Sequence, residues 1–120
     1  GGFNKVMRDG RSYMDAAYPF FHIDRASAVA CIMTGTVPYD NGIVGEHWMD
    51  RKTLRPMYCV DDATCEGWLT SEKYSPVALN VSTVTDELKM ATGGRALVYS
   101  IAPDADAAIL AAGHAADGAF

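Results

Sequence analysis

Apolar residues at helical spacing predict two helices in the first part of the chain. In residues 2–9 the apolar side chains recur at positions i, i+3 and i+4, and Gly10 is a typical helix end. Residues 26–33 are dense in small and apolar side chains, which favours a buried helix. Asp24 precedes this run as a suitable N-cap, because its carboxylate can accept hydrogen bonds from the free N–H groups of the first turn.

A third helix is predicted to end at Ala91. Ser82 or Thr83 can cap its N-terminus, and two acidic residues in its first turn complement the positive end of the helix dipole. The pair Gly93-Gly94 then stops the helix. We expect its inner face to consist of Val84, Leu88 and Ala91.

Two segments rich in aromatic and β-branched residues are predicted to be extended. Residues 11–21 favour a strand, and Pro19 indicates an edge strand or a strand exit. Residues 95–102 form the strongest predicted strand. Apolar and polar positions alternate poorly there, which is typical of a strand buried on both faces. Residues 107–112 are apolar again.

The middle of the chain, residues 46–76, is predicted to be a surface excursion that starts with a β-hairpin. Residues 38–45 form a turn-rich connection that leads into it and contain Asn41-Gly42. Residues 47–50 and 56–60 can then pair as the two strands of the hairpin. The remainder of the excursion is polar and irregular.

Helical and extended segments alternate along the chain, which is the pattern of an α/β fold. The 120 residues suit one small domain, and 49% hydrophobic residues are enough to bury a core. We therefore treat residues 1–120 as a single unit. The chain begins at Gly1 without an initiator Met and stops at Phe120 in mid-pattern, so we expect a partial domain of a larger protein.

Charge and hydropathy argue against nucleic acid and membranes as partners. The net charge is −5 and the ten basic residues are scattered, whereas a nucleic-acid footprint needs clustered Lys and Arg. We interpret the one basic cluster, Arg51, Lys52 and Arg55, as a solvated hairpin turn. No apolar run approaches the roughly 20 residues of a membrane helix, and residues 1–10 lack the apolar centre of a signal peptide.

The three cysteines, Cys31, Cys59 and Cys65, do not form a disulfide framework, because their number is odd. Cys59 and Cys65 can pair in an oxidising compartment or remain two independent thiols. Together with the three histidines, the cysteines show no recognised zinc-binding spacing.

Several short runs share the order and residue types of a known superfamily. The central one is Thr34-Gly35-Thr36-Val37-Pro38 followed by Asn41-Gly42-Ile43-Val44-Gly45. Further runs are Gly1-Gly2-Phe3, Trp48-Met49-Asp50-Arg51, Tyr58-Cys59-Val60-Asp61-Asp62, Ser82 to Leu88, and Ala108-Ile109-Leu110 with Gly113-His114-Ala115-Ala116-Asp117. Together they span nearly the whole chain and resemble the alkaline phosphatase superfamily, in its branch of nucleotide pyrophosphatase/phosphodiesterases and bacterial alkaline phosphatases with a Thr nucleophile.

The resemblance implies a partial α/β/α sandwich with a mostly parallel sheet. It also implies a parent protein that hydrolyses phosphoric or sulfuric esters, binds a small phosphate-ester-like ligand and is exported to the periplasm. An intact parent would bind two zinc ions through an Asp before Gly1 and through Asp and His residues beyond Phe120. We therefore expect no metal ligand and no cofactor in this chain.

The resemblance places Arg25 at the position of the family's nucleophilic Thr. A guanidinium cannot attack phosphorus or carry the covalent intermediate, so this substitution puts phosphatase activity in doubt. The nearest hydroxyl belongs to Ser27, which could act as the nucleophile only if the register of the turn differs. Otherwise we expect Ser27 to be a cap or a packed small residue.

Three acidic residues, Glu46, Asp104 and Asp106, fall at the positions where the family contacts phosphate. A phosphate carries about two negative charges near neutral pH, so three carboxylates around it would repel it. These acids are either solvated loop residues or partners of Arg25. In the second case the charges on both sides of one pocket would have been exchanged together, because buried charges persist when they are paired.

The remaining polar and aromatic candidates have structural explanations. His114 has an Asp three residues further on, but a metal site needs more partners, so we expect its ring to bond to backbone instead. His22 and His47 stand next to aromatic residues and are expected to pack against them. Trp48 and Trp68 either line a ligand pocket or belong to the core.

Three functions are weighed on this basis. The leading hypothesis is a fragment of an alkaline-phosphatase-like, metal-dependent ester hydrolase that is inactive alone. The second is a degenerate superfamily member that acts as a ligand-binding or interaction domain. The third is a free-standing small α/β binding domain whose family likeness is coincidental. Because the strand at residues 95–102 would lack a neighbour in a partial domain, we also expect the fragment to self-associate.

Overall fold

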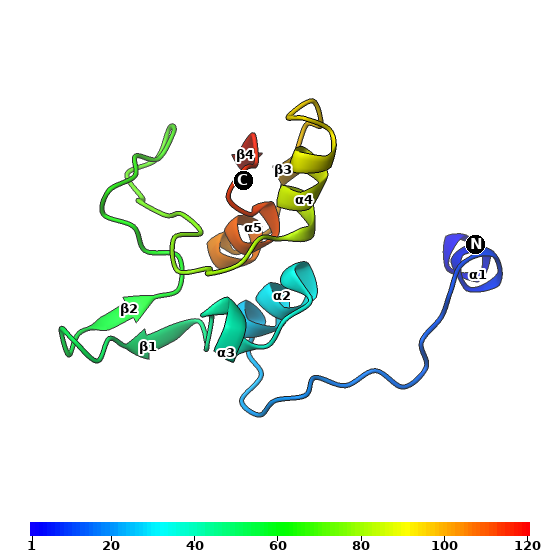
Figure 1. The fold of residues 1–120 in the computed structure, drawn as a ribbon, viewed down its shortest axis with the longest axis horizontal. Coiled ribbons are helices and arrows are strands. Elements are labelled where there is room, and N and C mark those ends of the chain that lie inside the picture. The colour runs from blue at the N-terminus through cyan, green and yellow to red at the C-terminus, as the bar shows by residue number, and fades with distance from the viewer.

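Helices and strands follow one another along the computed structural model, which describes residues 1–120 (Figure 1). The helices are α1 (Gly2–Asp9), α2 (Arg25–Thr34), α3 (Pro38–Asn41), α4 (Val84–Ala91) and α5 (Ala105–Ala112). The strands are β1 (His47–Met49), β2 (Pro56–Tyr58), β3 (Tyr99–Ser100) and β4 (Gly118–Ala119). The predicted α/β class is confirmed at this level. No helix has the length and apolar character needed to cross a membrane.

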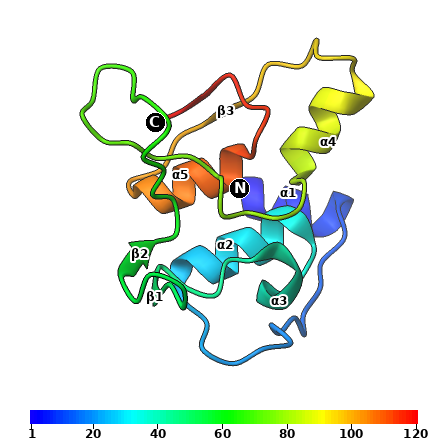
Figure 2. The same cartoon turned by 60° about the vertical axis from the view of Figure 1, so that its left-hand side comes forward.

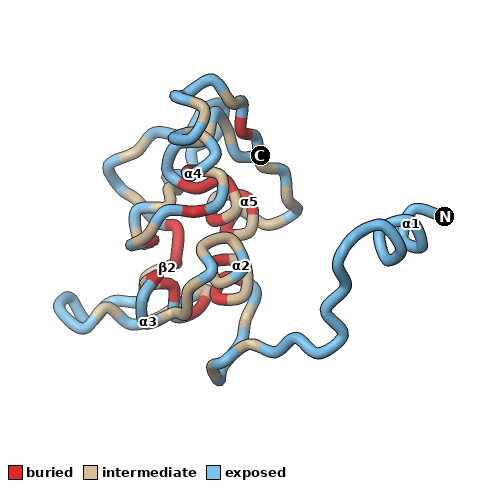
Figure 3. The backbone as a smooth tube through the Cα atoms, turned by 45° about the vertical axis from the view of Figure 1, so that its right-hand side comes forward, coloured by how far each residue is buried: buried red, intermediate tan, exposed pale blue.

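The core lies where α2 and α5 pack against each other (Figure 2). Its buried apolar residues are Ala26, Ala30, Ile43, Cys59, Val60, Leu79 and Leu110. Only 17 of the 120 residues are buried, and they gather around α2, α4, α5 and β2 (Figure 3). This is a small core for a chain that is 49% hydrophobic, so much of the apolar surface stays uncovered within these residues.

Helix α2 forms where the sequence predicts it. The Asp24 side chain accepts a hydrogen bond from the Ser27 backbone, and the Ser27 side chain accepts one from the Asp24 backbone, which makes a reciprocal capping box. Gly35, with a φ of 69°, ends the helix in the left-handed conformation that glycine adopts most easily. Local capping signals therefore fix both ends of this helix.

The predicted hairpin is present. β1 and β2 pair antiparallel, with His47 opposite Tyr58. The two rings stack with their centroids 4.8 Å apart, and Tyr58 also meets Tyr74 edge-on at 5.5 Å. His47 thus packs against an aromatic residue, as expected.

The connection before the hairpin contains one helical turn, α3, that the sequence analysis did not expect. Pro38 occupies the start of this helix, where its fixed φ suits a helix and its missing N–H is no loss. Gly42, with a φ of 87°, ends it after four residues. The turn residues predicted in this connection are present, and Pro38 at the first helical position is the local signal for the additional helical turn.

Helix α4 has a predicted cap, Thr83, but not the predicted inner face. Val84 and Leu88 are 60% and 49% exposed, so the prediction that they face the core was wrong. The buried side chain of this helix is Asp86. It accepts a hydrogen bond from the Thr83 backbone, which caps the helix, and one from the Ala115 backbone, which ties α4 to the segment after α5.

The segment predicted as the strongest strand forms only the two-residue strand β3, which pairs in parallel with β4 along one edge. Leu97, Tyr99 and Ile101 are exposed, so burial on both faces was a wrong prediction for this chain. A strand is buried only when neighbours cover it, and these residues supply one short partner. The expected mostly parallel sheet is likewise absent: one pair of strands is antiparallel and the other parallel.

Residues 1–23 extend away from the core (Figure 1). Helix α1 forms where predicted, but none of its residues is buried. The strand predicted over residues 11–21 was wrong, since this segment is irregular and almost entirely exposed. Its aromatic residues favour a strand only if a partner strand is available, and none lies beside it.

Candidate functional site

Arg25, the first residue of α2, lies among three carboxylates. Its Nε donates to the two oxygens of Asp106 at 3.2 and 3.1 Å, and its Nη2 donates to Asp106 Oδ1 at 3.0 Å. Nη1 lies 3.2 Å from Asp104 Oδ2, and Nη2 lies 3.4 Å from Glu46 Oε2. We refer to these four residues as the Arg25 cluster. The contact predicted between Arg25 and the acids is present with all three of them.

Three parts of the fold bring the Arg25 cluster together. Asp104 is the N-cap residue of α5, Asp106 lies in the first turn of that helix, and Glu46 directly precedes β1. The packing of α2 on α5 joins residues that are 81 positions apart in sequence. The start of α5 favours carboxylates, whereas the start of α2 disfavours the positive charge of Arg25. The carboxylates therefore compensate for an otherwise unfavourable position of the arginine.

The cluster carries surplus negative charge, because one guanidinium faces three carboxylates. Asp106 is fully buried, whereas the side chains of Arg25, Glu46 and Asp104 are 40%, 38% and 44% exposed. The hydrogen bonds to Asp106 raise the pKa of Arg25, so the guanidinium stays protonated. Asp106 thus forms the interior part of the cluster, and the other three residues face solvent.

Asp24 connects two positions of the site, a role that the sequence analysis missed. One oxygen accepts from the backbone and hydroxyl of Ser27, at 2.9 and 2.8 Å. The other accepts from the backbone N–H of Glu46 at 2.6 Å. Burial acts to raise the pKa of Asp24, but these hydrogen bonds outweigh it and lower the pKa. Its N-cap role was readable from the sequence, but its contact with Glu46 depends on the fold.

The Ser27 hydroxyl is used within the capping box. The residue is fully buried, its Oγ donates to the Asp24 carboxylate, and it accepts from the Asp24 backbone N–H at 3.1 Å. In this arrangement the hydroxyl does not face solvent, so a substrate has no open approach to it. The observed geometry is that of a cap.

Two other nucleophile types lie close to the cluster, at the end of β2. Burial, followed by the charge of Asp106, raises the pKa of Tyr58 to about 12. The same two causes raise the pKa of the buried Cys59 thiol to about 12. Both groups are therefore protonated near neutral pH and are weak nucleophiles. All three cysteines are free, so Cys59 and Cys65 are independent thiols here.

A second polar network surrounds His114, which is structural as predicted. Its Nε2 lies 3.0 Å from the Leu79 carbonyl oxygen, and its Nδ1 lies 3.1 Å from Asp86 Oδ2. Asp117 does not join it but pairs with Lys89 at 2.8 Å. These contacts tie the end of α5 to the start of α4 and to the loop before it.

The described residues offer no metal-binding site. Among residues 1–120, no group of three or more His, Cys, Asp or Glu side chains is arranged to hold a metal ion. The oxygens of the Arg25 cluster point at a guanidinium instead. These residues therefore do not form a donor set for the two zinc ions implied by the resemblance.

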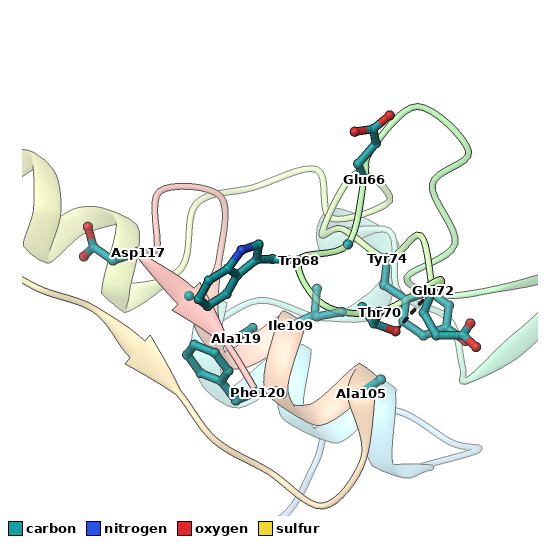
Figure 4. Close-up of a pocket in the computed structure, with 13 residues that line it drawn as sticks. Glu66, Trp68, Thr70, Glu72, Tyr74, Ala105, Ile109, Asp117, Ala119 and Phe120 are labelled. Atoms are coloured by element: carbon teal, nitrogen blue, oxygen red, sulfur yellow. Dashed lines mark hydrogen bonds between the residues drawn. The ribbon is translucent and has the colours of Figure 1, made fainter.

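A cavity of about 580 Å³ opens beside the other side of α5 (Figure 4). Trp68, Ile109 and Phe120 contribute to its apolar wall, and Glu66 and Glu72 also border it, with their carboxylates pointing outward. None of the four residues of the Arg25 cluster lines it. Trp68 thus borders a pocket, one of the two roles considered for it, whereas Trp48 packs against the core.

Comparison with known proteins identifies relatives over the whole chain. The family model described as type I phosphodiesterase / nucleotide pyrophosphatase matches residues 1–113. Alkaline phosphatase PhoV of Synechococcus elongatus is 39% identical over 123 residues, covering 100% of this chain and 22% of PhoV. The chain therefore spans about a fifth of the length of this relative.

Two solved structures of an alkaline phosphatase are also similar to this chain. The crystal structure of wild-type alkaline phosphatase PafA is 36% identical with a TM-score of 0.76, covering 79% of this chain and 19% of that one. A PafA variant in which a threonine, an asparagine, a lysine and an arginine are substituted gives a TM-score of 0.77 at 36% identity, covering 80% of this chain and 19% of the variant. The likeness is therefore not coincidental, which contradicts that part of the third hypothesis. This chain belongs to the type I phosphodiesterase / nucleotide pyrophosphatase family.

Proposed function

We propose that this chain is the part of a larger alkaline-phosphatase-like hydrolase domain that carries its ester-contacting positions, and that these residues do not hydrolyse esters alone. The first support is coverage, since the chain corresponds to 22% of PhoV and 19% of the solved PafA chain. Most of such a domain would then be built by other residues. The second support, which carries the proposal, is the Arg25 cluster.

The cluster contains two pairs of residues whose internal spacing matches that of two pairs substituted in the PafA variant. In that variant the asparagine follows the threonine at the separation at which Glu46 follows Arg25. The arginine follows the lysine by two positions, as Asp106 follows Asp104. The two pairs meet at one point in the structure of this chain. This supports their assignment to one site.

The chemistry of the cluster differs from that of a phosphate site. Arg25 stands in the place of a nucleophile but cannot form an ester with phosphorus. Three carboxylates stand in the place of the groups that attract phosphate, and a dianionic phosphate would be repelled by their surplus charge. A phosphate monoester would therefore not bind here in the manner of the family.

The remaining family properties belong to the proposed parent protein. We infer a mostly parallel sheet between helices, zinc dependence supplied by residues outside this segment, a small phosphate- or sulfate-ester ligand, and export to the periplasm. The exposed residues Leu97, Tyr99 and Ile101, together with the open edge of β3, support completion of the sheet by further strands. In the isolated segment, the same edge favours self-association.

A turnover assay tests the leading proposal. The purified 120-residue chain is incubated with an aryl phosphate and with a phosphodiester analogue in excess zinc. The expected result is no saturable turnover, because no metal-ligand set is present and the Ser27 hydroxyl is buried within the capping box. Turnover that persists through repurification and is lost in Ser27→Ala would contradict the proposal and identify the serine as the nucleophile.

The second candidate is a superfamily member that binds a ligand without turning it over. The observation that favours it is that the Arg25 guanidinium contacts all three acids. Its positive charge is therefore not free to bind an ester oxygen. The test uses the full-length protein with aryl phosphate, aryl sulfate and phosphodiester substrates. Absence of turnover of all three supports this candidate, and zinc-dependent turnover of any one of them rejects it.

A further inference from the structure

Asp24 is placed to control the geometry of the Arg25 cluster although it is not one of its members. It directly precedes Arg25 in the chain, and its Oδ2 accepts the backbone N–H of Glu46 at 2.6 Å. We propose that Asp24 is a positioning residue that holds Glu46 beside Arg25. The importance of the Arg25 cluster rests on the proposed function. The hydrogen bond between Asp24 and Glu46 does not depend on any ligand.

The two oxygens of Asp24 have separate tasks. Oδ1 accepts from the backbone and the hydroxyl of Ser27, which fixes the first turn of α2 and thereby the start of the Arg25 side chain. Oδ2 accepts from Glu46 and fixes the loop that leads into β1. Because both oxygens are engaged, the carboxylate cannot rotate without breaking one of the two connections. The cap and the site are thus coupled through one side chain.

Gly45, the residue before Glu46, allows the loop backbone to come close to the Asp24 carboxylate. A Cβ atom added to Gly45 would lie 3.0 Å from Asp24 Oδ2. Real Cβ atoms rarely come so close to an oxygen, so a side chain here would push the loop and the carboxylate apart. The absence of a side chain at position 45 lets the backbone reach Asp24.

Glu46 depends on this connection more than the other acids do. Asp104 and Asp106 are held by helix α5, whereas Glu46 lies in a loop and makes the longest contact with Arg25, at 3.4 Å. The Glu46 carbonyl accepts from the Cys59 backbone, which ties one side of the residue to the hairpin. The Glu46 N–H donates to Asp24, so loss of this hydrogen bond would leave the N-terminal side of Glu46 without a fixed contact.

The test separates capping from positioning. Asp24→Ser keeps an N-cap of similar quality, but its single short hydroxyl cannot serve Ser27 and Glu46 together. In the full chain we expect amide hydrogen exchange at Glu46 to accelerate about tenfold or more relative to Ser27, as for loss of a hydrogen bond to a charged group. The coupling between Arg25 and Glu46 in a double-mutant cycle should disappear, while that between Arg25 and Asp106 remains.

Two further variants keep the test decisive. Asp24→Asn preserves size but has one acceptor oxygen for two donors. Because Asn is a good N-cap, its oxygen should stay on the Ser27 N–H and its NH₂ should face Glu46, so the Glu46 amide should again be released, even if Asp24→Ser folds poorly. Thr83→Ala removes the cap of α4 and should leave exchange at Glu46 unchanged. If both Asp24 variants lower stability but retain Glu46 protection and the Arg25–Glu46 coupling, Asp24 is only a helix cap and the proposal is wrong. Neither readout uses turnover, so this outcome is independent of the proposed hydrolase function.

Discussion

The Arg25 cluster shows how a change at one residue depends on its partners. A guanidinium at the start of a helix is unfavourable alone, and a buried carboxylate at Asp106 is unfavourable alone, but together they satisfy each other. Glu46 and Asp104 add partly exposed contacts that solvent screens. The pair of Arg25 with Asp106 should therefore dominate the stability of the cluster.

Loss of the arginine should destabilise the chain through Asp106. In Arg25→Gln the fully buried carboxylate loses its charged partner, and an unsatisfied buried group costs on the order of 1–3 kcal/mol. Urea denaturation measures the free energy of unfolding. Adding Asp106→Asn should recover part of the loss, because the uncompensated charge is removed. Equal unfolding midpoints for wild type and Arg25→Gln would show that the pair does not stabilise the fold.

Asp86 should make stability depend on pH in the acid range. Burial acts to raise its pKa, but hydrogen bonds from the Thr83 and Ala115 backbones and from His114 outweigh burial and lower the pKa to about 2. The unfolded carboxyl titrates near 3.8. The ionised group therefore stabilises the fold above that value, and the contribution, on the order of 2 kcal/mol, is lost as the pH falls from about 4 through 2.

The measurement for Asp86 is the free energy of unfolding between about pH 5 and pH 2. Asp86→Asn should flatten this dependence, whereas the exposed control Asp15→Asn should leave it in place. An identical acid transition in wild type and Asp86→Asn would assign the pH dependence to other carboxyl groups.

For individual residues, contacts between opposite charges could be predicted from the sequence. Contacts that depend on how distant segments pack together could not. The pairing of Arg25 with the acids was predictable, because the resemblance predicted opposite charges around one site and buried charges persist when they are paired. The Glu46 contact of Asp24 and the closeness of Tyr58 to Asp106 were not. Both contacts depend on where a loop or the end of a strand lies relative to the start of a helix. The spacing of residues in the sequence does not reveal that position.

Among the secondary-structure elements, the helices were predictable because their signals are local. The capping residues of α2 and α4 and the glycines after α1 and α2 are visible in the sequence and determine where each helix ends. The strands were not, because a strand needs a partner. Residues 11–21 and most of residues 95–102 have strand-forming composition but lack neighbours in this chain.

Gly113, at the end of α5, should tolerate no side chain. Its φ is +79°, and an added Cβ would overlap Thr83 Oγ1 and lie 2.8 Å from the Asp86 carboxylate oxygens. Gly113→Ala should therefore disrupt the contact between α5 and the cap of α4. Gly93→Ala is the matched control, since its φ is +59° but nothing lies within 4 Å of the new atom.

The two alanine variants compare an open positive-φ site with a crowded one whose backbone, at a ψ of −166°, lies in a region almost exclusive to glycine. Gly93→Ala should lose about 1–2 kcal/mol, the cost of the left-handed conformation for a residue with a Cβ. Gly113→Ala should lose more, since strain and collision add. The free energies of unfolding of both variants provide the comparison, and equal losses would mean that neither the backbone conformation nor the close contacts of Gly113 exclude a side chain.

As a whole molecule, the chain leaves a large apolar surface uncovered. Leu97 and Ile101, beside the open edge of β3, are 75% and 83% exposed. Such edges recruit further strands, so we expect self-association that rises with concentration, measured by light scattering. Leu97→Lys should weaken it by placing a charge at the edge, whereas Val77→Lys, in an exposed loop, should not. A strictly monomeric particle at all concentrations would contradict this expectation.

The central claim is that Arg25, Glu46, Asp104 and Asp106 form one ester site whose charges have been exchanged. Calorimetric titration of the full-length protein with inorganic phosphate tests it most directly. Wild type is compared with a variant that carries Arg25→Thr, Glu46→Asn, Asp104→Lys and Asp106→Arg, the residue types named for the PafA variant. The account predicts phosphate binding in the fourfold variant and none in wild type. Saturable binding of phosphate to wild type, unchanged by the four substitutions, would contradict it.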